Sequence, residues 1–79
     1  MADKAPTQRE RVLEYVQGCG ERGATAWEVE VALQMRSSSV NPRMWELRKS
    51  ASIVPTERRR PTESGCDAVV HVAAEYAKN

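Results

Sequence analysis

Residues 35–53, MRSSSVNPRMWELRKSASI, form the segment around which the rest of the chain is arranged. Four apolar side chains, Val40, Met44, Leu47 and Ala51, recur in it at steps of four, three and four residues. This spacing predicts a helix with one apolar face, because side chains three and four residues apart lie on the same side of an α-helix. At about 100° per residue, the opposite face consists of Ser38, Pro42, Trp45 and Lys49, flanked by Asn41, Arg48 and Glu46, with Ser39 and Arg43 at the shoulder.

The start of this helix has two competing registers. The serines before it are good N-caps, and a start after Ser37 or Ser38 places Pro42 within about the first turn. Amides there have no acceptor inside the helix, so the missing N–H of proline costs little. In the other register Asn41 is the cap and Pro42 takes the first helical position.

Two further helices are predicted upstream, each opened by a capping box. In this motif a hydroxyl side chain and a carboxylate side chain lie three residues apart, and each accepts a hydrogen bond from the backbone amide of the other residue. Thr7 and Glu10 have this spacing, and so do Thr25 and Glu28. The first helix should therefore begin after residue 7 and end among the glycines at positions 18, 20 and 23. The second should run from about residue 26 to about residue 35.

The apolar positions of these two helices indicate which sides face the core. The first helix is expected to turn inward Val12, Leu13, Val16 and Cys19, with Tyr15 beside them. The second is expected to turn inward Val29, Ala32 and Leu33. Its Glu28 and Glu30 should stay in solvent, while Trp27 and Val31 could cover an edge of the core.

Downstream of the central helix the pattern changes to that of a β-hairpin. Residues 53–60 are strand-like, residues 61–67 are dense in turn formers, and residues 68–73 form the returning strand. Pro55 indicates that the first strand lies partly at an edge, since proline cannot donate to a neighbouring strand. The extended link at residues 24–25 could add a third short strand.

Length and composition predict one small globular domain. The chain has 79 residues, of which 41% are hydrophobic and 29% charged, values typical of folded proteins. Residues 7–73 are expected to form the domain, residues 1–6 a disordered N-terminal tail, and residues 74–79 a C-terminal tail. No apolar run approaches the ~20 residues needed to span a bilayer, so we expect a cytoplasmic protein with no membrane partner.

Basic charge is concentrated in the middle of the chain. The net charge is only +1, but residues 36–60 carry seven basic and two acidic side chains, a local charge of +5. The segments on either side each carry −2. A local basic patch of this kind favours an acidic partner such as a nucleic acid.

Catalysis and metal binding have little support in the sequence. His71 lies among alternating apolar residues and is expected to be a partly buried structural residue. Cys19, Cys66 and His71 lack the spacing of a zinc site, and with no signal peptide both cysteines should be free thiols. We therefore expect no enzyme activity, no catalytic residues, no metal, no cofactor and no small-molecule substrate.

The order of elements matches a helix-turn-helix unit followed by a hairpin. In the segments GATAWEVEVAL (residues 23–33), SSSVNPRMWEL (37–47) and RRRPTESGCDAVVHV (58–72) the chain resembles small winged helix-turn-helix DNA-binding proteins of bacteriophages and prophages. The resemblance implies an α+β winged helix, with a three-helix core and a C-terminal β-hairpin wing, in a bacterial host cell. The chain departs from the pattern of these proteins in two places. They commonly have a glycine after the recognition helix, where this chain has Ser50, Ala51 and Ser52. They also often have a basic residue after the wing glycine, where this chain has Cys66 and Asp67.

The leading hypothesis is binding of double-stranded DNA, sequence-specific or general, in regulating transcription or phage DNA metabolism. The central helix would enter the major groove and the wing would hold flanking phosphates or an adjacent minor groove. The predicted contacts on the helix are Ser38, Ser39, Asn41, Arg43, Trp45, Arg48 and Lys49. Those on the wing are Arg58, Arg59, Arg60 and Thr62, although an edge strand also uses such charges to block aggregation.

Trp45 leaves a second hypothesis open. An outward Trp could contact sugars or thymine methyl groups, it could anchor a protein partner, or the wing or a neighbouring helix could cover it. The alternative function is therefore a protein-interaction module that uses Trp27 or Trp45 to bind a host or phage protein, for example to inhibit host machinery. A homodimer is also compatible with the sequence, although no heptad pattern supports one.

Overall fold

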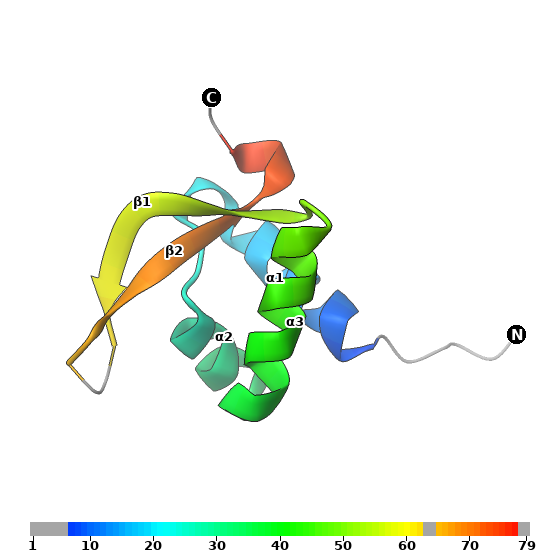
Figure 1. Cartoon of the computed structure of the whole chain (residues 1–79), viewed down its shortest axis with the longest axis vertical. Coiled ribbons are helices and arrows are strands. Elements are labelled where there is room, and N and C mark those ends of the chain that lie inside the picture. Colours follow the sequence, from blue (N-terminus) through cyan, green and yellow to red (C-terminus); the bar gives the residue numbers. More distant parts are fainter. Residues whose placement is uncertain (1–6, 63–64, 78–79) are drawn as a thin grey trace, which may run out of the picture.

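The computed structural model describes residues 7–62 and 65–77, which form three helices followed by a β-hairpin (Figure 1). The helix α1, Gln8–Cys19, continues into a 3₁₀ turn, η1, at Gly20–Arg22, and is followed by α2, Ala26–Leu33, and α3, Ser37–Lys49. The strands β1, Ile53–Pro61, and β2, Asp67–Ala73, pair antiparallel, and a 3₁₀ turn, η2, follows at Ala74–Tyr76. This is an α+β arrangement of the winged-helix type, as the sequence predicted.

Both capping boxes are confirmed. The Thr7 hydroxyl accepts from the Glu10 amide at 3.2 Å, and the Glu10 carboxylate accepts from the Thr7 amide at 2.8 Å. Thr25 and Glu28 make the same two bonds at 3.2 and 2.9 Å. These contacts satisfy amides that have no acceptor within the first turn, so α1 and α2 begin where the local sequence dictates.

Four predictions about α2 are wrong. The helix ends at Leu33 rather than near residue 35, because Gln34 adopts a left-handed conformation with φ of 54°. Ala32, predicted to face inward, is exposed. Glu28 and Glu30, both predicted to lie in solvent, are half-buried. The carboxylate of Glu28 binds both Thr25 and the hairpin.

The start of α3 also differs from both predicted registers. Arg36 is the N-cap residue, and no serine side chain makes a capping hydrogen bond. Pro42 therefore lies inside the helix, beyond the first turn, and has no N–H to donate to the carbonyl of Ser38. Ser38 and Pro42 are both exposed, so this interruption lies on the solvent-facing side of α3.

The end of α3 corrects one core residue. Ala51, predicted to face inward, is exposed and lies past the helix with φ of 61°. Its amide donates to the carbonyl of Arg48 at 3.0 Å, and the amide of Ser52 donates to the carbonyl of Leu47 at 2.8 Å. This is the Schellman ending of a helix, in which glycine usually takes the position that Ala51 occupies here.

The core lies between the helices and the base of the hairpin. It is formed by Val12, Val16, Ala24, Val29, Val40, Met44, Leu47 and Ile53. Ala24 also pairs with β2, since its N–H and C=O each bond the backbone of His71 at 2.8 Å. The link at residues 24–25 therefore forms an isolated bridge rather than the third short strand that the sequence allowed, and this bridge attaches the α1–α2 connection to the two-stranded sheet.

The hairpin runs from the C-terminal end of α3 past the helices, and the end of β1 and the start of β2 lie on the side of α2 in Figure 1. Its register places Ile53 opposite Ala73 and Pro61 opposite Asp67, with an irregularity between Pro55 and Arg59. Residues 74–76, predicted as part of a tail, form η2. The predicted tails at residues 1–6 and 78–79, and residues 63–64 of the predicted turn, lie outside the described residues.

None of the described helices combines the length and the apolar character needed to cross a membrane.

Candidate nucleic-acid interface

The face of α3 that points away from the core carries most of the predicted groove residues. Val40, Met44 and Leu47 are buried, which fixes the rotation of the helix. The exposed residues on its other side are Ser38, Asn41, Pro42, Trp45, Arg48 and Lys49. Ser39 and Arg43 are half-buried at its shoulder.

Trp45 lies in the middle of this exposed face. Its exposed fraction is 59%, so the alternative in which the wing or a neighbouring helix covers it is wrong. The Nζ atom of Lys49, one turn later, lies 4.8 Å from the centre of the indole ring. This cation–π contact places positive charge against the ring and restrains its orientation.

Arg43 is directed toward α1. Its Nε donates to Oε1 of Glu46 at 3.0 Å, and its Nη1 donates to Oε1 of Gln8 at 3.2 Å. The guanidinium therefore neutralises the acidic side chain on α3 and ties α3 to the start of α1. It is less available for a base edge than the sequence alone suggested.

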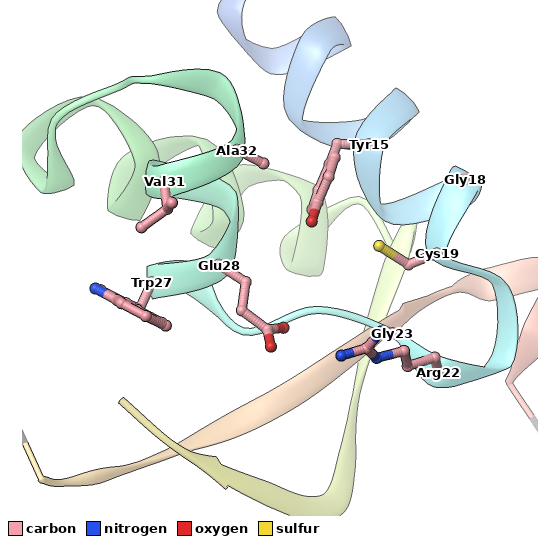
Figure 2. Close-up of a pocket in the computed structure, with 9 residues that line it drawn as sticks. All are labelled: Tyr15, Gly18, Cys19, Arg22, Gly23, Trp27, Glu28, Val31 and Ala32. Atoms are coloured by element: carbon pink, nitrogen blue, oxygen red, sulfur yellow. The ribbon is translucent and has the colours of Figure 1, made fainter. Parts of the chain in front are cut away.

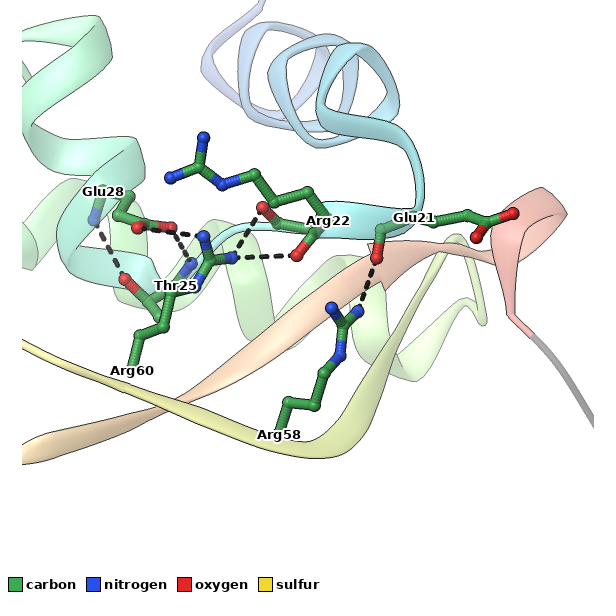
Figure 3. Close-up of polar contacts among 7 residues, drawn as sticks. Glu21, Arg22, Thr25, Glu28, Arg58 and Arg60 are labelled. Carbon is green, nitrogen blue, oxygen red and sulfur yellow. Dashed lines mark hydrogen bonds and ion pairs between the residues drawn. The ribbon is translucent and has the colours of Figure 1, made fainter.

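Arg60 joins the hairpin to the connection between α1 and α2, as Figure 3 shows. Its Nη2 donates to the carbonyls of Arg22 at 2.9 Å and Gly23 at 2.8 Å. Its Nη1 lies 3.4 Å from Oε2 of Glu28, whose other carboxylate oxygen caps α2. Arg60 therefore fixes the position of the hairpin against the N-terminus of α2.

The other predicted wing residues divide into two groups. Arg58 donates to the carbonyl of Glu21, and Thr62 donates through its hydroxyl to the carbonyl of Cys66 at 2.9 Å, which shapes the turn. The side chain of Arg59 is exposed, and within residues 7–62 and 65–77 its guanidinium has no hydrogen bond or ion pair. Because neighbouring side chains alternate across a strand, Arg59 points to the opposite face of the hairpin from Arg60. Of the three wing arginines, Arg59 is the one whose guanidinium has no partner among the described residues.

His71 is buried in β2, where its backbone pairs with Ala24, and 8% of its surface is exposed. Neither ring nitrogen has a hydrogen-bond partner among the described residues. Burial and the positive charge of Arg48 lower the pKa of His71, and the backbone of Val69 opposes this shift only in part. The sequence predicted that His71 is at least partly buried, which is confirmed. The lowered pKa favours the neutral form of the ring at neutral pH.

A groove of about 500 Å³ lies between α1 and α2 (Figure 2). Trp27 and Val31 border it from α2, and Tyr15 and Cys19 border it from α1. Val31 is 59% exposed, so the predicted cover at the edge of the core is incomplete. Burial is the main factor that raises the pKa of Tyr15, followed by the neighbouring Cys19. The i and i+4 spacing of Trp27 and Val31 was the sequence signal for this surface.

Within the described parts of the chain, no three His, Cys, Asp or Glu side chains are grouped so that they could hold a metal ion. Cys19 and Cys66 are both free thiols, Cys19 partly buried in the groove and Cys66 exposed at the turn of the hairpin.

Some contacts of this interface have a signal in the local sequence and others have none. The spacings of Arg43 with Glu46 and of Trp45 with Lys49 are those of neighbours on a helix, so both contacts could have been found without the fold. The contacts of Arg60 join residues more than thirty positions apart and had no local signal.

Comparison with protein-family models and with curated protein sequences gave no match.

Proposed function

We propose that this domain binds double-stranded DNA, with α3 in the major groove and Arg59 of the wing on a flanking phosphate. The observation that carries the proposal is the exposed face of α3, where Asn41, Trp45, Arg48 and Lys49 lie together while the one acidic neighbour, Glu46, is neutralised by Arg43. Regulation of transcription or of phage DNA metabolism in a bacterial cell is the role that fits such an activity.

The dimensions and charges of α3 suit this role. A helix of 13 residues is about 20 Å long, and the major groove is about 12 Å wide, which admits one helix. Exposed Arg36, Arg48, Lys49 and Arg59 supply positive charge at both ends of α3 and on the wing. Arg58 and Arg60 support the interface indirectly, because their bonds to the α1–α2 connection hold the wing in place.

The direct test is titration of a fluorescently labelled random duplex at two salt concentrations. If four side chains each neutralise one phosphate, affinity should fall about 100-fold between about 50 and 200 mM salt. Replacing Arg59 with Gln should lower the slope of log affinity against log salt concentration by the amount expected for about one phosphate contact. Replacing Arg11 with Gln, an equal charge change on α1, should leave it unaltered. Absence of binding at the lower salt concentration would refute the proposal.

A second candidate function is a protein-interaction module that uses the groove between α1 and α2. The exposed Val31 beside Trp27 favours it, because such an apolar pair can accept an apolar side chain of a partner. Affinity capture from bacterial lysate would test it with three proteins: wild type, Val31→Glu and Trp45→Ala. A partner that Val31→Glu loses and Trp45→Ala retains would support this candidate, and equal capture by all three would exclude this groove.

A further inference from the structure

The exposed face of α3 has an apolar centre, which is unusual for a surface expected to meet polar base edges. Pro42 and Trp45 are neighbours at i and i+3, and both are exposed. Lys49 covers part of the indole with its ammonium group, 4.8 Å from the ring centre. The basic and amide side chains of Asn41, Arg48 and Lys49 surround this apolar centre rather than replace it.

The chemistry of the major groove limits what such a centre can contact. Guanine, cytosine and adenine present hydrogen-bonding groups there, whereas thymine adds an apolar 5-methyl group. The carbon face of an indole placed against a polar edge would remove water from donors and acceptors without replacing their hydrogen bonds, which is unfavourable. Contact with a methyl group instead buries apolar surface on both partners.

We propose that Trp45 recognises the 5-methyl group of thymine, with Lys49 fixing the orientation of its ring, so that the domain prefers DNA with thymine at the centre of its site. This inference rests on the proposed binding of α3 in the major groove. Asn41 lies one turn earlier on the same face, about 6 Å along the helix axis, and its amide matches the N6 and N7 edge of adenine. Both side chains therefore favour A·T pairs within two base steps of each other.

The test compares two pairs of duplexes with alternating sequence, and the members of each pair differ only in the 5-methyl group of the pyrimidine. One pair is dA–dT and dA–dU, and the other is dG–5-methyl-dC and dG–dC. Wild-type protein should bind dA–dT about fourfold more tightly than dA–dU for each methyl group contacted. It should also prefer methylated dG–dC over the unmethylated duplex, because the methyl group occupies the same position on either pyrimidine.

Trp45→Ala should abolish both preferences, and circular dichroism should show the fold unchanged because the side chain is exposed. Arg59→Gln is the matched control, since it should weaken binding to all four duplexes equally and preserve both ratios. Equal wild-type affinity for dA–dT and dA–dU would overturn the inference while leaving DNA binding intact, as would a preference that survives in Trp45→Ala. Failure to bind any of the four duplexes at low salt would instead overturn the proposed function.

Discussion

Replacing Gly23 with Ala should strongly destabilise the protein, although the change adds a single methyl group. Gly23 lies where the α1–α2 connection crosses β2, with φ of +69°. A Cβ atom built there would lie 2.4 Å from the carbonyl oxygen of His71, 2.7 Å from Cγ1 of Val70 and 2.9 Å from Cγ1 of Val72. The first of these atoms is backbone, so a side-chain rotation cannot relieve the contact.

The expected loss is the sum of three effects. Placing a Cβ in the left-handed region costs roughly 1–2 kcal/mol. Separating the connection from β2 weakens the two hydrogen bonds between Ala24 and His71, both 2.8 Å long, at about 1 kcal/mol each. Displacing the two valines adds overpacking. We expect a total of roughly 3–5 kcal/mol, and a domain of this size is stable by only roughly 4–12 kcal/mol.

Urea unfolding followed by circular dichroism at about 222 nm, which reports helical content, measures this loss in unfolding free energy. Gly18→Ala is the matched control, because Gly18 lies in α1 with no atom within 4 Å of the added Cβ. There the same substitution should stabilise the protein by about 0.5–1 kcal/mol through helix propensity. A Gly23→Ala protein within about 1 kcal/mol of wild type would refute the reasoning.

Three further changes test the fold. Ala51→Gly should stabilise the protein by about 0.5–1 kcal/mol and raise its melting temperature by about 3–6 °C, because glycine tolerates the left-handed φ at the end of α3; an unchanged or lower value would contradict the assignment. His71 has a lowered pKa in the folded state, so the unfolded chain binds its proton first and stability should fall as pH drops below about 6.5, by up to about 1.4 kcal/mol per pH unit. His71→Leu should flatten that part of the curve, measured as urea midpoints between about pH 5 and 7.5, and an equal slope in the variant would exclude His71 as its source. Arg60→Met should cost about 1–3 kcal/mol by removing charged bonds to backbone carbonyls, whereas Arg59→Met should change stability by less than about 0.5 kcal/mol; equal effects in thermal denaturation would argue against the role of Arg60.

The helices and the hairpin could be predicted because the interactions that create them are local. Each capping box joins two residues three positions apart, and the stripe of Val40, Met44 and Leu47 follows from helical geometry alone. The predictions failed at helix ends. The residues after α2 and α3 adopt positive φ at Gln34 and Ala51, conformations that neither residue type announces.

The candidate site was predicted in the same uneven way. The exposed face of α3 follows from the position of its buried face, so Asn41, Trp45 and Lys49 could be assigned to the surface from the sequence. Only the tertiary structure could decide whether the surface around Trp45 is exposed, because a segment distant in the sequence could have covered it. The structure leaves 59% of the Trp45 surface exposed, so no described element closes over it.

The sequence by itself determined the order of elements, the starts of α1 and α2 and the face of α3 that folds inward, since each depends on contacts within one or two helical turns. Only the tertiary structure decided which of three consecutive arginines is free. Arg58 and Arg60 bind carbonyls of the α1–α2 connection, 37 or 38 positions away, while Arg59 points to the other face. Identical side chains in a row carry no local signal that distinguishes them, so their roles depend on what the chain brings to each face of the strand.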